Sequence, residues 1–170
     1  MLYVLLAVNA AVYTAIGRLA EGLDALAWFA LLVLFELEMR WPAWARTARN
    51  AAVLGLLRLA AAASIGIAAL IFLHEGEWLD ALNAWLWIGV VAVLELEVRA
   101  PALIARNRRA VNRASMALYA ALAAVAMAWL AQGQWFDGYD AVLWIAAFAL
   151  IEMDLLNAAA GAATPDNTPG

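Results

Sequence analysis

The segment Phe35–Pro42, FELEMRWP, recurs twice in this chain and indicates how the chain is organised. It returns almost unchanged as LELEVRAP at residues 94–101, and in shortened form as IEMD at residues 151–154. Each copy ends a strongly apolar run, and a tryptophan (Trp28, Trp87 or Trp144) precedes the first acid of each copy by eight residues. The chain therefore has the pattern of a tandem repeat whose recurrent chemistry is a pair of carboxylates near the end of an apolar helix.

Composition indicates that these apolar runs lie in a lipid bilayer. Of the 170 residues, 68% are hydrophobic and 14% are charged, whereas about 25% are charged in ordinary soluble domains. The chain has no cysteine and a single histidine, His74, which excludes thiolate metal sites, iron–sulfur clusters and bis-histidine haem within it. The net charge of −4 offers no basic field to nucleic acid.

Six apolar runs are long enough to form membrane helices, and they occupy residues 2–17, 24–40, 51–73, 80–99, 114–131 and 140–158. A crossing needs about 20 residues, and every backbone polar group in lipid must be paired within the protein. The runs therefore predict an all-α polytopic membrane protein with six transmembrane helices in one domain, residues 1–158. Residues 159–170 contain little to bury, so we expect a disordered tail there.

The six helices group into three tandem hairpins at about residues 1–41, 51–100 and 114–158. Each hairpin crosses the membrane twice, so all three copies share one orientation. Three parallel hairpins can close into a bundle around a pseudo-threefold axis, or they can lie in a row. The sequence does not choose between these two arrangements.

Arginine determines the predicted sidedness. Eight arginines lie in the loops after the second and fourth runs, whereas the loops on the opposite side contain only Arg18. The positive-inside rule then places both termini in the cytoplasm. Arginine without lysine, together with abundant alanine, is typical of GC-rich bacterial DNA, so we expect the bacterial inner membrane. The arginines that we expect to contact lipid headgroups are Arg40, Arg99, Arg106, Arg108 and Arg109.

The repeated acids are the candidate functional residues, and they are Glu36, Glu38, Glu95, Glu97, Glu152 and Asp154. Two acids that are two residues apart on a helix point about 200° away from each other, so one pair cannot chelate an ion alone. About eleven apolar residues precede each pair, or about 16 Å of helix, which predicts that the acids begin inside the cytoplasmic half of the bilayer. A carboxylate there costs about 2–3 kcal/mol unless it finds a partner or a proton.

Three interpretations of the acids remain open. They can anchor the helix ends through pairs four residues apart, Glu36 with Arg40 and Glu95 with Arg99. They can form a cation or proton site, with Arg58 as a further partner at similar depth. They can also dock a partner protein that supplies basic residues, and whether the site would take a metal ion is left open.

Other polar residues in the apolar runs have structural interpretations. Asp24, Asn83 and Asp140 stand just before apolar runs, where Asp and Asn typically cap helix N-termini. Asn9 and Tyr13 are one turn apart and are expected to make an interhelical hydrogen bond.

Two functional hypotheses follow from these residues. We favour a non-catalytic subunit or scaffold of a larger membrane complex, because the loops are short and no cofactor ligands are present. The alternative is a cation or proton transporter or channel that uses the repeated carboxylates. We expect the protein not to be an enzyme and to need no cofactor, since no phosphate-binding loop, catalytic triad or metalloprotease motif occurs. Its expected partners are the lipid bilayer and, in either role, other membrane subunits or further copies of itself.

Overall fold

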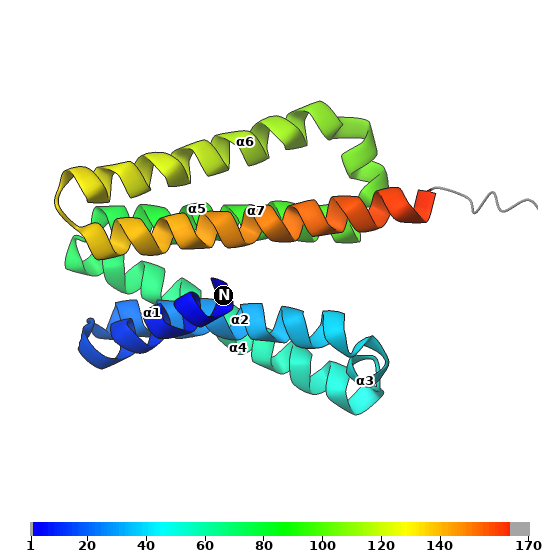
Figure 1. The fold of residues 1–170 in the computed structure, drawn as a ribbon, viewed down its shortest axis with the longest axis horizontal. Coiled ribbons are helices and arrows are strands. Elements are labelled where there is room, and N and C mark those ends of the chain that lie inside the picture. Colours follow the sequence, from blue (N-terminus) through cyan, green and yellow to red (C-terminus); the bar gives the residue numbers. More distant parts are fainter. Residues whose placement is uncertain (1, 164–170) are drawn as a thin grey trace, which may run out of the picture.

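The computed structural model of the protein describes the backbone of residues 2–163, and the side chains in that range except those of residues 95, 97–99, 101 and 151–163. Within residues 2–163 the chain forms helices and no strands, which confirms the all-α prediction (Figure 1). The helices are α1 (Leu2–Ile16), α2 (Leu19–Arg40), α3 (Pro42–Ala45), α4 (Ala48–Glu75), α5 (Trp78–Arg99), α6 (Pro101–Ala131) and α7 (Trp135–Ala163).

Proline and glycine mark the reversals between the long helices. Pro42 and Pro101 each occupy the first position of a new helix, where the missing N–H of proline costs nothing because that group would be unpaired in any case. At the opposite end of the molecule, Gly76 and Gly133 both have a φ of +80°. A side chain is disfavoured at that backbone angle, so glycine lets the chain leave α4 and α6 and turn at once into the next helix.

Several helices are longer than the sequence pattern predicts. Residues 101–113 belong to α6 rather than to a loop, and α6 is kinked at Asn107, whose backbone angles are φ −116° and ψ 21°. Arginine and alanine are good helix formers, so a polar composition did not prevent a helix there. α7 continues to Ala163, so residues 159–163 of the expected tail are helical, whereas residues 164–170 lie outside the described part of the chain.

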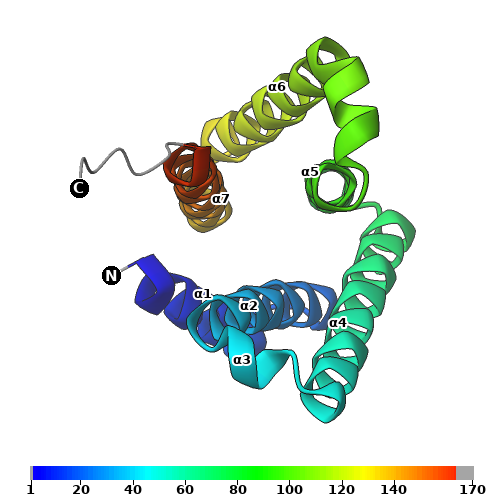
Figure 2. The ribbon, with the colours of Figure 1, turned by 90° about the vertical axis from the view of Figure 1, so that its right-hand side faces the viewer.

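The long helices form a closed ring, which answers the question of ring or row. α1 packs between α2 and α7, α4 packs between α2 and α5, and α6 packs between α5 and α7. Seen down the long axis, the helices surround a common centre (Figure 2). Each of α1, α4 and α6 thus joins two of α2, α5 and α7.

Aromatic side chains from three helices meet at the centre of the ring. The ring centroids of Trp28 in α2 and Trp87 in α5 are 6.0 Å apart, and those of Trp28 and Trp144 in α7 are 6.3 Å apart. Phe148 lies 4.7 Å from Trp87 and 6.3 Å from Trp144, also between centroids. All three tryptophans are buried. The tryptophans that recur in the sequence therefore form one aromatic cluster that ties the three hairpins together.

Two helices in the described part of the chain are long and apolar enough to cross a membrane, Ala48–Glu75 and Ala102–Ala131. Leu2–Ile16 and Trp78–Leu94 are apolar but shorter. Only 28% and 22% of the most apolar windows of the two long helices are buried within the protein, whereas the core helix of a soluble protein is mostly buried. Large apolar side chains such as Leu56, Leu59 and Leu70 on α4 are exposed. The six membrane crossings expected from the sequence stay a prediction.

Candidate functional site

The repeated acids near the end of α2 are paired with arginine. Glu38 makes an ion pair with Arg58 of α4, the residue named above as a further partner of the acids. Glu36 lies 3.2 Å from the guanidinium of Arg40 and accepts a hydrogen bond from the Tyr3 hydroxyl at 3.4 Å. Both glutamates are partly exposed. The first copy of the repeated pair is therefore charge-compensated within the chain.

The remaining predicted site residues fall into two groups. The side chains of Glu95, Glu97, Arg99, Glu152 and Asp154 lie outside the described residues. The predicted ring of six acids thus stays a prediction. Arg40, Arg106, Arg108 and Arg109 are exposed, and their contact with lipid headgroups also stays a prediction.

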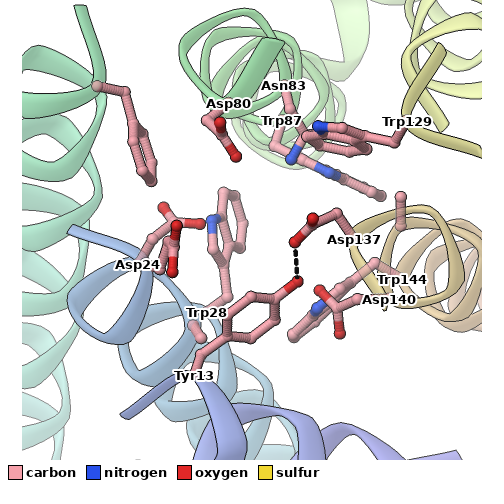
Figure 3. A pocket seen from close by; sticks show the side chains of 14 residues that line it. Tyr13, Asp24, Trp28, Asp80, Asn83, Trp87, Trp129, Asp137, Asp140 and Trp144 are labelled. Atoms are coloured by element: carbon pink, nitrogen blue, oxygen red, sulfur yellow. Dashed lines mark hydrogen bonds between the residues drawn. The ribbon is translucent and has the colours of Figure 1, made fainter. Parts of the chain in front are cut away.

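A polar cavity of about 60 Å³ lies at the opposite end of the ring, among the ends of α1, α4 and α6 and the beginnings of α2, α5 and α7 (Figure 3). A water molecule needs about 15 Å³ when volume is measured in this way, so the cavity has room for about four waters. Its walls combine carboxylates with indole rings, and Phe72 of α4, Trp129 of α6 and Tyr13 of α1 complete the lining.

Three matching helix faces supply most of this lining. Each face consists of an acidic residue, an Asp or Asn three residues later, and a Trp four residues after that. The residues are Glu21, Asp24 and Trp28 in α2; Asp80, Asn83 and Trp87 in α5; and Asp137, Asp140 and Trp144 in α7. Spacings of three and four place side chains on one side of a helix. We call each set an acid–tryptophan face, and the sequence analysis above missed this pattern although all three copies carry it.

Asp24, Asn83 and Asp140 are not helix N-caps, which corrects the interpretation made from the sequence. Each is the sixth residue of its helix, since α2, α5 and α7 begin at residues 19, 78 and 135. An N-cap side chain accepts hydrogen bonds from the free backbone N–H groups of the first helical turn. In these helices the first turn precedes Asp24, Asn83 and Asp140 in the chain. Their side chains instead line the cavity.

Helix α1 closes the ring by donating hydrogen bonds to α7. The Asn9 side-chain amide donates to Asp140 Oδ1 at 2.7 Å, and the Tyr13 hydroxyl donates to Asp137 Oδ1 at 2.7 Å. Asn9 is only 4% exposed, so this hydrogen bond lies in the interior of the bundle. These bonds confirm the interhelical hydrogen bonding predicted for Asn9 and Tyr13, and they identify acid–tryptophan face residues as the acceptors.

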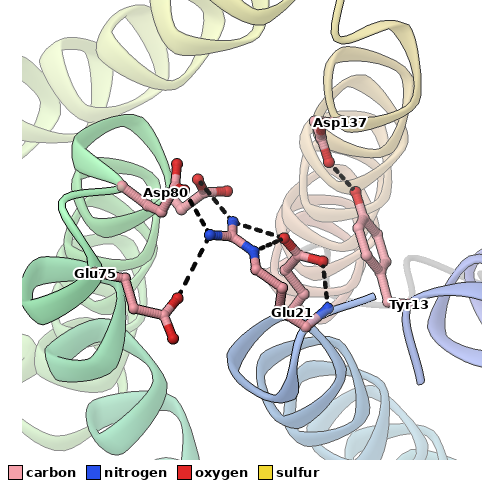
Figure 4. A network of polar contacts seen from close by, with 7 residues as sticks. Tyr13, Glu21, Glu75, Asp80 and Asp137 are labelled. Atoms are coloured by element: carbon pink, nitrogen blue, oxygen red, sulfur yellow. Dashed lines mark hydrogen bonds and ion pairs between the residues drawn. The ribbon is translucent and has the colours of Figure 1, made fainter. Parts of the chain in front are cut away.

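Arg18, between α1 and α2, joins the first hairpin to the second. Figure 4 labels three acidic partners of Arg18, namely Glu21, Glu75 and Asp80. Its guanidinium lies 2.7 Å from Glu21, 2.5 Å from Glu77, 3.4 Å from Glu75 and 3.9 Å from Asp80. Burial lowers the pKa of Arg18, but hydrogen bonds and charge interactions with Glu21 and Glu77 outweigh it, so the pKa is raised. Arg18 therefore stays charged next to two of the cavity acids. In the sequence, Arg18 was notable only as the single arginine in the loops on the side opposite the eight other loop arginines.

Three buried polar atoms at the cavity make no hydrogen bond of standard geometry within the described residues, although the indole of Trp28 lies close enough to the Asp24 carboxylate to interact with it. They are Asp24 Oδ1, Trp28 Nε1 and Asn83 Oδ1. Trp28 is only 7% exposed, and it lines the cavity together with the other two residues. An unpaired buried polar atom costs about 1–3 kcal/mol, so these atoms favour water or a polar ligand in the cavity.

The charges at the cavity are predominantly negative and are spread around its wall. Five carboxylates line it, those of Glu21, Asp24, Asp80, Asp137 and Asp140, and Arg18 also pairs with Glu75 and Glu77 outside it. No group of three or more His, Cys, Asp or Glu side chains in the described part of the chain is arranged to hold a metal ion. The arrangement is thus suited to attract a cation, but it does not gather ligands around one metal-sized point.

Comparison with protein-family models, with curated proteins and with solved structures finds no match to this chain.

Proposed function

We propose that this chain is a membrane protein with six crossing helices that transports a small cation or protons, and that the cavity between the acid–tryptophan faces is its binding site. The main observation in support is that three helices contribute matching side chains to one cavity. Each helix contributes an acid, an Asp or Asn, and a Trp. Polar and acidic groups are costly inside a membrane bundle, and they typically mark the paths of ions and protons.

The uncovered apolar surface of α4 and α6 supports the membrane part of the proposal. The four other long helices pack beside them in the same ring, so lipid that surrounds α4 and α6 would surround the whole bundle. By the arginine distribution, the cavity would face the outer side of a bacterial inner membrane, with both termini in the cytoplasm.

The aromatic cluster sets the limit of the cavity. Phe148 follows Trp144 by one helical turn and packs against Trp87 and Trp144. Buried apolar residues, including Leu32, Val90 and Ala147, continue the core around it. A cation would therefore enter from the outer side and bind above the tryptophans, and passage to the cytoplasm would require this cluster to part. The proposed mechanism is an alternation between two states of the protein. In one state the aromatic cluster is closed and the cavity is open to the outer side, and in the other the cluster is parted and the cavity is open to the cytoplasm.

This proposal moves the transport site predicted from the sequence to the other end of the bundle. Glu36 and Glu38 have arginine partners, whereas the cavity acids Asp24, Asp137 and Asp140 form no ion pair with a basic side chain of the described residues. An added cation would therefore compensate the cavity acids more. The subunit or scaffold role stays the competing prediction. A stable complex with other proteins after purification in mild detergent would favour that role.

The test is flux into proteoliposomes that contain the purified full chain. We expect uptake of Na⁺ or K⁺, or acidification followed with a pH-sensitive dye, above that of protein-free liposomes. Asp140→Asn keeps the oxygen that accepts from Asn9 but removes one charge, so it should lower the flux about tenfold. Flux equal to that of protein-free liposomes, under gradients of Na⁺, K⁺, protons and small ammonium ions, would contradict the proposal.

A further inference from the structure

We propose that the cavity selects a small organic cation that carries N–H groups, namely a short primary alkylammonium such as methylammonium. This inference rests on the proposed function, since it names the substrate class of the same site. Four features of the cavity support this inference: its indole walls, its unpaired acceptor oxygens, the wide spacing of its carboxylates and its small volume.

The carboxylates are too dispersed for a bare metal ion. Hard metal ions take about six oxygen ligands at about 2.0–2.6 Å, and the described residues contain no cluster of acids that meets this need. Four of the five cavity acids also have partners within the chain. Asp137 and Asp140 accept hydrogen bonds from Tyr13 and Asn9, and Arg18 pairs with the other two, Glu21 and Asp80. An ammonium ion needs only one carboxylate and two further acceptors.

Two unpaired acceptor oxygens belong to the lining of this cavity. Asp24 Oδ1 and Asn83 Oδ1 are buried, unpaired and part of the same cavity wall. Two N–H groups of one ammonium would pair the two oxygens, and an ionised Asp24 would make its bond one of the stronger class. A quaternary ammonium has no N–H to offer and would leave both oxygens unpaired.

The indole rings of the cavity wall suit the alkyl group of an alkylammonium ion. Trp28, Trp87 and Trp144 meet at the base of the cavity, with Trp28 central to the other two. Indole faces attract organic cations, and they also contact the methyl groups of such ions favourably. A cavity of about 60 Å³ is small, so we expect methylammonium and ethylammonium to bind and bulkier amines to be excluded.

The experiment is a binding titration of the full chain in detergent micelles, by calorimetry and by tryptophan fluorescence. The probes are methylammonium, tetramethylammonium, Na⁺ and K⁺, all as chlorides. We expect methylammonium to bind at least about tenfold more tightly than the other three ions. Asp24→Asn should weaken methylammonium binding about tenfold or more, because it removes the charged acceptor and leaves a carboxamide like that of Asn83.

The matched control is Glu36→Gln, which removes one carboxylate at the other end of the same helix. We expect its methylammonium affinity to stay within about twofold of the unmodified chain. Far-UV circular dichroism and a single elution peak establish that each variant is folded.

The outcomes separate this inference from the proposed function. Binding of Na⁺ or K⁺ that depends on Asp24, without binding of methylammonium, would overturn the ammonium inference and support cation transport. Methylammonium binding that depends on Asp24, without flux of any cation into liposomes, would support the inference and contradict transport. Methylammonium binding that Asp24→Asn leaves unchanged would overturn the inference, and no cation binding at all would overturn both.

Discussion

The two ends of the bundle use the same residue types in different ways. At the end of α2, Glu36 and Glu38 are partly exposed and pair with Arg40 and Arg58. At the beginning of α2, Glu21 and Asp24 line a cavity with Trp28. The difference lies in spacing. Acids two residues apart point to opposite sides of a helix, whereas residues spaced three and four apart share one side.

The comparison shows that the spacing of the acids, rather than their number, distinguishes the candidate site from the locally paired acids in this helical chain. The Glu-x-Glu segments are the most conspicuous charges in the sequence, yet the copy that the structure describes is compensated locally by arginine. The less conspicuous acids form matching faces on three helices and converge on one cavity. Predictions that contrast matched residues at the two ends test this distinction.

The largest expected effect comes from removing a tryptophan of the aromatic cluster. Trp28→Ala should lower the free energy of unfolding by about 3–5 kcal/mol, because it deletes a buried side chain that contacts two other hairpins. Trp44→Ala, at the other end of the bundle, should cost about 0.5 kcal/mol or less, since Trp44 is 49% exposed. Unfolding in mixed micelles with increasing dodecyl sulfate, followed by circular dichroism, measures both. Equal losses would contradict the central role of the cluster.

A smaller effect is expected from two tyrosine hydroxyls. Tyr13→Phe keeps the ring but removes the 2.7 Å hydrogen bond to Asp137, so it should cost about 1–3 kcal/mol of unfolding free energy. Tyr3→Phe removes a 3.4 Å bond to Glu36 in an exposed setting and should cost about 0.5 kcal/mol or less. The same unfolding assay applies, and a larger loss for Tyr3→Phe would reverse the proposed ranking of the two ends.

The smallest effects are expected from the two arginines. Arg18 and Arg58 are 42% and 46% exposed, and exposed ion pairs contribute about 0–1 kcal/mol. Arg18→Gln should cost more than Arg58→Gln, because Arg18 contacts four acids on two hairpins whereas Arg58 pairs with Glu38. Raising the salt concentration should shrink the difference, since salt screens exposed charges. A difference that is unchanged by salt would show that packing, not charge, is responsible.

Much of the fold could be predicted from the sequence. Long apolar runs indicate helices, and the recurrence of Trp28, Trp87 and Trp144 indicates three equivalent hairpins. The start of α6 could not be predicted in the same way, because residues 101–113 are polar and hydropathy alone does not distinguish a polar helix from a loop. The closure of the ring depends on contacts between α1 and α7, which are far apart in the chain.

The candidate site was harder to predict, for two physical reasons. Asp24, Asn83 and Asp140 stand where apolar runs begin, and that position is typical of N-caps as well as of a helix interior that starts earlier. Arg18 contacts Glu75, Glu77 and Asp80 only because two hairpins pack together. The recurring acid, Asp or Asn, and Trp spacing was present in the sequence, and comparing all three copies at every polar position would have revealed it.

The most direct test of the central claim compares two double variants in the same proteoliposome flux assay. The claim is that the cavity acids, rather than the repeated Glu-x-Glu acids, bind the transported cation. We predict that Asp24→Asn with Asp140→Asn abolishes cation uptake, and that Glu36→Gln with Glu38→Gln keeps it within about twofold of the unmodified chain. Uptake that survives the first pair of substitutions and is lost with the second would contradict the account.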